Sequence, residues 1–219
     1  MNDEKLATCS IRPSVLFGPG DPQFVPSLHA CIAKWETPFV LGHAENLWDV
    51  TYVGNIADAH VLAVENMLSS KTAAGEAFFI SNEAPITFRD FCLAVWREFG
   101  HFPPFEVHIP EILAASLGHI AEWVTWLTGT QTTISSASVR DACSIRYCTG
   151  EKARKILGYK PRVDLEEGIR ITCAKYAERL KANAEDPIPN PAPFRALPTL
   201  SINFKAPKAR INALFNRVK

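Results

Sequence analysis

Residues 11–26, IRPSVLFGPGDPQFVP, have types and spacing that suggest chemistry. An apolar run, a glycine-rich bend and the start of a helical pattern are typical of a turn that binds nucleotide phosphates. That fingerprint needs three glycines, and here Gly18 and Gly20 are followed by no third one. Asp21 would place a negative charge where the phosphate belongs, and Pro22 removes an amide donor. We therefore expect no phosphate binding at this turn.

Catalytic groups of other kinds do not emerge from the sequence either. No serine stands in a GxSxG elbow, which disfavours a serine hydrolase of the α/β type. A tyrosine four residues before a lysine would suit a dehydrogenase, because the ammonium group lowers the pKa of the phenol that takes the alcohol proton. None of the four tyrosines has that lysine: Tyr52, Tyr147, Tyr159 and Tyr176. We therefore assign no catalytic residue.

Composition excludes several classes of partner. The 219 residues carry no net charge, which argues against nucleic acid as the main partner. The six cysteines contain no CxxC pair and the six histidines no HExxH, so we expect no metal site. Scattered cysteines in a chain with no hydrophobic leader are typical of an intracellular protein with reduced thiols.

Strands and helices alternate along the chain, which predicts an α/β fold with at least two parallel strands. Residues 6–11 and 77–81 read as buried strands, with shorter strands at 39–42 and 48–53. Asn55, with Asp58 three residues later, is expected to cap a helix whose apolar character predicts cover on both sides, and His60 on it reads as a hydrogen-bonded core histidine. Further helices are expected from Phe24 through Trp35, from Thr87 to Phe99, from Thr149 to Gly158 and from Asp164 onwards.

The end of the chain differs in composition. Residues 109–127 form an apolar stripe interrupted by charged residues, so a core or lid helix is favoured over membrane contact through Trp123 and Trp126. After residue 186 the chain has six prolines, six Lys or Arg and no acid. Residues 211–218 have the spacing of a small basic amphipathic helix of the kind that lies on anionic membranes. At that length disorder in water is the more expected state.

Four segments, read in order, resemble one known family. They are IRPSVLFGPGDPQFVP, NLWDVTYVGNIADAHVLAVE, GEAFFISNEAPITF and ARKILGYKPRVDLEEGI. Together they are similar to the C-terminal half of the 3β-hydroxysteroid dehydrogenase family, within the extended short-chain dehydrogenases, and closest to its sterol-4α-carboxylate 3-dehydrogenase (decarboxylating) branch. The resemblance covers roughly residues 5–180.

The resemblance implies the C-terminal part of a Rossmann-type fold. Residues 6–11 and 77–81 would be the last two parallel strands of the nucleotide sheet, and relatives carry the glycine fingerprint and the catalytic Ser, Tyr and Lys upstream of them. The expected units are 1–108, the end of that sheet with interleaved substrate-lobe segments; 109–182, a helical substrate lobe; and 183–219, a proline-rich basic tail. We expect the nucleotide-binding half to be missing.

The resemblance also implies a site. In relatives the backbone after such a strand lies beside the nicotinamide of NAD or NADP, which here designates Pro13, Ser14 and Val15. The alternative, that this turn only ends a strand and begins a helix, stays open. The residues designated to line an apolar sterol cleft are Phe17, Phe24 and Trp48. From the sequence alone those three aromatics read as core.

In the whole enzymes of this family a hydride leaves C3 of the sterol, and the resulting β-keto acid can lose CO₂. We expect this chain to be the sterol-binding half of such an enzyme and to show no turnover by itself. The alternative function is a non-catalytic, lipid-binding or membrane-peripheral module. Expected partners are a sterol or steroid, a membrane surface, and either a second copy or the missing half. The expected location is the cytoplasm, including the surface of the endoplasmic reticulum membrane.

Overall fold

The computed structural model describes residues 6–110, 112–113, 116, 140 and 142–185. Most of the apolar helix expected over residues 109–127 lies outside these residues, as does the tail after residue 185. The described elements, in chain order, are β1 (Ser10–Pro13), β2 (Leu16–Phe17), α1 (Phe24–Ala33), β3 (Phe39–Leu41), β4 (Leu47–Trp48), β5 (Thr51–Tyr52), α2 (Val53–Leu68), β6 (Ala77–Ile80), β7 (Ile86–Thr87), α3 (Phe88–Glu98), β8 (Val107–Ile109), α6 (Glu151–Leu157) and α7 (Leu165–Glu185).

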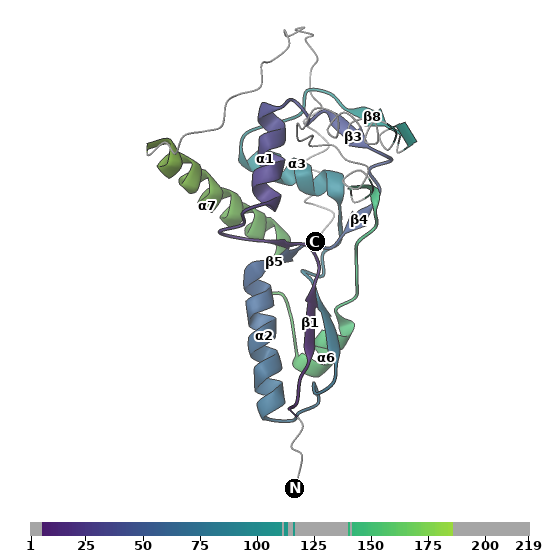
Figure 1. Ribbon diagram of the computed structural model, residues 1–219, viewed down its shortest axis with the longest axis vertical. Helices are drawn as coiled ribbons and strands as arrows, with labels where there is room; N and C mark the ends of the chain where they lie inside the picture. The colour runs from purple at the N-terminus through teal and green to yellow at the C-terminus, as the bar shows by residue number, and fades with distance from the viewer. Residues whose placement is uncertain (1–5, 111, 114–115, 117–139, 141, 186–219) are drawn as a thin grey trace, which may run out of the picture.

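Strands β1 and β6 form a parallel pair, with Ser10 opposite Ala77 and Pro13 opposite Ile80. Figure 1 shows this pair standing between α2 and α6. One core cluster holds the pair and both helices together, because Phe78 and Ile80 of β6 pack with α2 and with Tyr159, which follows α6. The predicted parallel pair is therefore confirmed. The expected burial of the first strand is wrong: β1 begins at Ser10, with Ser10 and Ile11 half-buried and Arg12 and Pro13 exposed.

A second core cluster lies between helices α1, α3 and α7 and strands β2, β4 and β5. Phe91, Val95 and Trp96 on one face of α3 are its centre, and each is less than 5% exposed. The buried indole of Trp96 donates its Nε1 hydrogen to the carbonyl oxygen of Leu28 in α1, at 2.7 Å. This hydrogen bond links α3 to α1. It also gives the buried indole N–H of Trp96 an acceptor, which it would otherwise lack.

Several predicted helix boundaries agree with the structure. Thr87 Oγ1 accepts a hydrogen bond from the amide of Asp90 at 3.0 Å and so caps α3. Asp164 Oδ1 accepts from the amide of Glu167 at 2.8 Å before α7. Helix α6 ends at Gly158, whose φ of +68° belongs to the left-handed conformation that glycine adopts without strain. Local capping chemistry was enough to find these ends.

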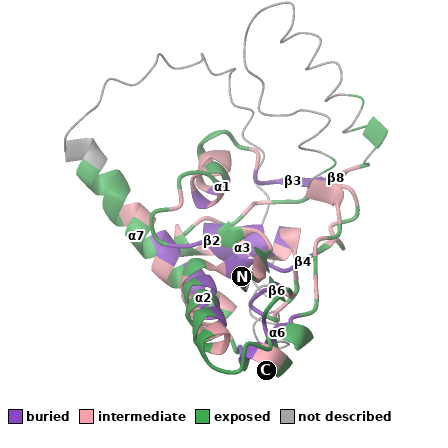
Figure 2. Ribbon diagram, turned by 60° about the horizontal axis from the view of Figure 1, so that its bottom comes forward, coloured by how far each residue is buried: buried purple, intermediate pink, exposed green. Residues whose placement is uncertain are grey.

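Other expectations were wrong. Helix α1 ends at Ala33, so Trp35 lies outside the helix, with a φ of +58°. The expected strand at 48–53 is two short strands, since Asp49 and Val50 separate β4 from β5. Helix α2 is not covered on both sides: Val61 and Val64 are each 57% exposed. Figure 2 shows the exposed residues along the outer side of this helix in green.

The described parts of 109–182 belong to both packing regions. Helix α6 contacts β6 and α2, while α7 contacts α1 and α3. A small parallel pair, β3 with β8, joins residues 39–41 to 107–109 across the boundary proposed at residue 108. The division of the chain at residues 108 and 182 stays a prediction.

Candidate functional site

The turn after β1 lies at the carboxyl end of the β1–β6 pair. The amide of Ser14 donates to the carbonyl oxygen of Ile80 at 3.4 Å, and the amide of Thr51 donates to the carbonyl oxygen of Val15 at 2.8 Å. Pro13 is exposed, and Ser14 and Val15 are half-buried. In open parallel sheets, ligands bind at this end of the strands. The contact of Pro13, Ser14 and Val15 with a nicotinamide ring stays a prediction.

Asn55 is the centre of a buried hydrogen-bond network at the same end of β6. Its Nδ2 donates to Asn82 Oδ1 at 3.0 Å and to the carbonyl oxygen of Val163 at 2.7 Å. Its Oδ1 accepts from the amides of Arg162 and Val163. Asn82 adds a bond from its Nδ2 to the carbonyl oxygen of Val163 and accepts from the amide of Tyr52. Two side chains thus fasten α2, the end of β6 and the connection from α6 to α7.

The expected capping role of Asn55 is therefore wrong. Tyr52 occupies the N-cap position, and the Asn55 side chain bonds to another segment because that segment offers backbone groups in need of partners. Asp58, its expected capping partner, forms an ion pair with Arg162 at 3.0 Å. His60 is exposed, so it is not a core histidine, and its Nδ1 lies 2.8 Å from a carbonyl oxygen of its own helix.

Asp49 is a buried carboxyl group in the same region, only 1% exposed, and it was missed in the sequence. Its Oδ1 has no hydrogen-bond partner among the described residues. Burial raises the pKa of Asp49, while hydrogen bonds from the Ser81 hydroxyl and from the backbone of Cys148 lower it. Glu83 adds a further upward contribution through its negative charge. The position between β4 and β5 gave no signal, because an aspartate there usually marks an exposed loop.

The glycine-rich turn is occupied by its own aspartate. The carboxylate of Asp21 accepts hydrogen bonds from three backbone amides at the start of α1, those of Gln23, Phe24 and Val25, at 2.8, 3.0 and 2.8 Å. These are the donors that a phosphate would need at a helix N-terminus. The same turn shapes a cavity of about 40 Å³ against α7, where Arg179 donates to the Asp21 carbonyl oxygen. Such a cavity holds about one water molecule and no sterol.

Gly18 is needed for packing in this turn. A Cβ added to it would lie 2.2 Å from Cγ1 of Val53 and 2.9 Å from its Cβ, which no relaxed contact allows. The glycine that resembles a nucleotide fingerprint therefore permits the close approach of the turn to the start of α2. This explains the residue without any ligand.

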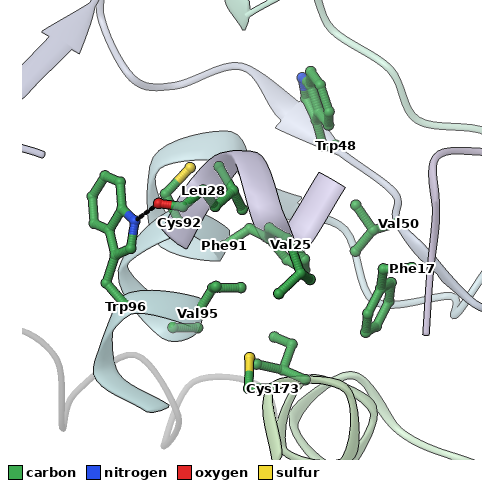
Figure 3. Close-up of a cluster of buried hydrophobic side chains, with 12 residues drawn as sticks. Phe17, Val25, Leu28, Trp48, Val50, Phe91, Cys92, Val95, Trp96 and Cys173 are labelled. Carbon is green, nitrogen blue, oxygen red and sulfur yellow. Dashed lines mark hydrogen bonds between the residues drawn. The ribbon is translucent and has the colours of Figure 1, made fainter. Parts of the chain in front are cut away.

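The three aromatics designated for the sterol cleft do come together. Phe24 stacks on Trp48 with ring centres 6.2 Å apart, and on Phe91 at 5.2 Å. Phe17 meets the edge of Phe91 at 5.6 Å. Phe17 and Trp48 are 1% and 6% exposed, and Figure 3 shows both within the cluster around Phe91. In this arrangement their packing partners are other side chains of the chain, and their contact with a sterol stays a prediction.

Two further properties concern the described residues only. Within them, no group of three or more His, Cys, Asp or Glu side chains is placed to hold a metal ion. No helix in that part of the chain combines the length and apolarity that crossing a bilayer requires.

Comparison with known proteins decides the family. The model of the 3-beta hydroxysteroid dehydrogenase/isomerase family matches residues 1–110. The chain belongs to this family. It is 42% identical over 174 residues to the sterol-4-alpha-carboxylate 3-dehydrogenase erg26, decarboxylating, of Schizosaccharomyces pombe, which covers 79% of this chain and 51% of that enzyme. The chain thus spans about half the length of the curated relatives it matches.

Solved structures confirm the fold class of this 3β-hydroxysteroid dehydrogenase family member. The epimerase Mth375 of Methanothermobacter thermautotrophicus aligns with a TM-score of 0.55 at 18% identity, over 84% of this chain and 47% of the other. A UDP-glucuronic acid 4-epimerase of Bacillus cereus, solved with UDP-glucuronic acid and NAD, aligns with a TM-score of 0.51 at 15% identity, over 78% and 45%. The fold is therefore that of the Rossmann-type extended short-chain dehydrogenases and epimerases.

Proposed function

We propose that this chain supplies the substrate-binding half of an NAD(P)-dependent 3β-hydroxysteroid or sterol-4α-carboxylate 3-dehydrogenase. The observation that carries the proposal is the 42% identity to an enzyme with that name, spread over 79% of the chain. Identity at this level over most of the chain favours a shared substrate class over a shared fold alone. The NAD in the B. cereus epimerase supports a nicotinamide cofactor.

The residues here fit one part of such a cofactor and not another. The Asp21 carboxylate takes up the amides at the start of α1, so that helix offers no place for the diphosphate. The turn at the carboxyl end of β1, where Pro13 is exposed and Ser14 half-buried, is the end of the strands at which ligands bind in such sheets. When bound, the cofactor would supply the hydride acceptor. Pro13, Ser14 and Val15 would hold the ring in position.

The chain's contribution to the reaction is then binding and orientation. A proton acceptor for the sterol hydroxyl is assigned to none of its residues, since no tyrosine stands four positions before a lysine. The apolar contacts for the sterol would come from Phe17, Phe24 and Trp48. Because these side chains pack against one another and against Phe91, the cluster would have to open before a sterol could enter. We therefore propose that the chain is inactive by itself and acts with a nucleotide-binding half.

Formation of NADH from NAD and a 4-carboxysterol tests this function. The chain alone should give none, whereas the chain co-expressed with the nucleotide-binding half of the S. pombe relative should give measurable turnover. Turnover by the chain alone would contradict the proposed dependence on a partner. A stable complex of the two halves that binds NAD but neither binds nor oxidises the sterol would contradict the substrate assignment.

The second candidate function is a non-catalytic, lipid-binding or membrane-peripheral module. It is favoured by exposed aromatic side chains of the described region, such as Trp35 at 65% and Phe39 at 48% exposure. Both candidate functions are compatible with the proposed location at the surface of the endoplasmic reticulum membrane. The two functions differ in one measurement: a non-catalytic module would bind a sterol or a lipid surface and would gain no turnover from the added nucleotide-binding half.

A further inference from the structure

Helix α2 carries apolar side chains on the side that faces away from the core. Seven positions of this helix are exposed, and the five apolar ones, which we name the α2 stripe, are Val53, Ala57, Val61, Val64 and Leu68. Val61 and Val64 are each 57% exposed and Leu68 is 80% exposed. The opposite side of the helix packs into the cluster around Phe78 and Ile80 of β6. Figure 2 shows the exposed side of α2 in green.

The α2 stripe differs from an ordinary solvent-facing side of a helix. Such a side carries mostly charged and polar residues, as in α7, where Glu166, Arg170 and Glu178 are exposed. Among the exposed positions of α2, only His60 and Glu65 can carry a charge. A continuous apolar stripe that the core does not use is typical of a surface that contacts another protein.

The spacing within the α2 stripe is that of a coiled coil. Ala57, Val61, Val64 and Leu68 follow one another at intervals of four, three and four residues, which places all four on one side of the helix. In the heptad notation Ala57 and Val64 occupy d positions, while Val61 and Leu68 occupy a positions. Two helices with this pattern pack by inserting the side chains of each into holes on the other. The identical stripe of a second copy is therefore a matched partner.

The charges beside the α2 stripe indicate how two copies would face each other. His60 occupies a g position and Glu65 an e position, on opposite flanks of the stripe. In a parallel pair of helices a g residue faces the e residue five positions later on the partner, so His60 of each copy faces Glu65 of the other. In an antiparallel pair Glu65 would face Glu65. Asp58, at the other e position, forms an ion pair with Arg162 at 3.0 Å and so adds no net charge to this flank.

We propose that two copies of this chain associate through α2, with the two helices packed as a parallel pair around a two-fold axis. The contact is isologous, since each a or d residue of the stripe meets the same residue of the second copy. A single pair of short helices buries less surface than a standard protein–protein interface, so the dimer is weak, with a dissociation constant in the micromolar range. The contact requires neither cofactor nor sterol, and it is independent of the proposed dehydrogenase function.

Sedimentation equilibrium of the full chain, from micromolar to near-millimolar concentration, tests the proposal. Wild type should dimerise, and Val64→Lys should weaken the dimer about tenfold or more, because it brings two unpaired ammonium groups together in the contact. The melting temperature of Val64→Lys at low protein concentration should stay level, since position 64 is exposed in the single chain and lysine is a good helix former. The matched control is Ile145→Lys, at a position 70% exposed outside α2, which should dimerise within about twofold of wild type.

His60→Lys tests the orientation of the two helices. In a parallel pair the lysine places a full positive charge opposite Glu65 of the second copy, so the dimer should tighten about threefold at low salt and lose this gain at high salt. In an antiparallel pair position 60 faces position 60, so the same substitution would weaken the dimer and overturn the proposed packing.

Three other outcomes overturn the contact itself. They are a wild type that stays monomeric at every concentration, a Val64→Lys variant that dimerises like wild type, and an Ile145→Lys variant that loses as much association as Val64→Lys. A monomeric wild type whose complex with the nucleotide-binding half of the S. pombe relative is abolished by Val64→Lys would assign the stripe to that half instead. The association measurements of the chain alone involve no turnover, so their failure would leave the dehydrogenase assignment unaffected.

Discussion

Asn55 and Asn82 share a hydrogen bond of 3.0 Å between buried side chains that stand 27 residues apart in the chain. Both amide groups also bond to the carbonyl oxygen of Val163, 108 residues from Asn55. Helix α2, the end of β6 and the start of α7 therefore depend on one small polar network. Because both side chains are less than 5% exposed, water offers no replacement for a lost partner.

Replacing Asn55 with alanine should destabilise the fold strongly. It leaves the amides of Arg162 and Val163 and the Oδ1 of Asn82 without this partner, at a cost of about 1–3 kcal/mol for each buried group left unsatisfied. We expect a loss of about 3 kcal/mol in the free energy of unfolding, measured by urea titration. His60→Ala, at an exposed position of the same helix, should change it by less than about 0.5 kcal/mol. Equal effects of the two substitutions would refute the role of the network.

The contact between Gly18 and Val53 supplies a second prediction. Gly18→Ala places a methyl group 2.2 Å from Val53 Cγ1 and should cost about 1–3 kcal/mol in the free energy of unfolding. Trimming the partner in Val53→Ala removes Cγ1 and leaves the 2.9 Å approach to Cβ, so the double variant should recover part of the loss. Thermal or urea unfolding of the four proteins of this cycle gives the coupling energy. Strict additivity would show that the two residues do not clash.

The helices and the parallel pair were predictable because their signals are local. Thr87, Asp164 and Gly158 end or begin helices through bonds made within a few residues, and such bonds are visible as spacing in the sequence. The resemblance to the family then placed the two long strands in one sheet, and the β1–β6 register agrees. Prediction worked wherever a residue's partner was near in the chain or where several motifs pointed to one fold.

The candidate site was predicted less well because its contacts are long-range. Asn55 looked like a helix cap since a nearby partner is the simplest one for an asparagine, yet its partners lie 27, 107 and 108 residues away. Asp49 looked like a loop residue and is buried. Two polar residues, Ser81 at the end of a predicted strand and Asn82 right after it, were the signal that would have located this region, because such residues gather at the carboxyl edge of parallel strands.

Thiol reactivity provides a third prediction. Burial raises the pKa of Cys92 to about 12 and that of Cys173 to about 12, so at pH 8 only a very small fraction of either is thiolate. Iodoacetamide should therefore leave both unmodified in the native protein and alkylate both in urea, as followed by peptide mass spectrometry. Cys9, which is only half-buried, is the internal reference and should react first. Modification of Cys92 as fast as Cys9 would contradict the packing of α3 against α1.

The fourth prediction concerns Asp49 and pH. Burial is the main cause of its raised pKa, so the folded state binds this proton more tightly than the unfolded state, whose value is near 3.8. A folded pKa above the unfolded one stabilises the protein below the unfolded pKa, and this stabilisation is lost as the pH rises through the folded pKa. Asp49→Asn keeps the shape and a hydrogen-bond acceptor for Ser81 or the Cys148 backbone, and it removes the buried charge.

The variant should therefore match wild type near pH 4 and exceed it in free energy of unfolding at pH 8, with a flatter pH profile in urea titrations. Glu178→Gln, which neutralises an exposed carboxylate on α7, should leave the slope of the profile unchanged. Should Asp49→Asn be the less stable protein at pH 8, the carboxylate must have a donor for its unpartnered Oδ1, and the burial argument fails.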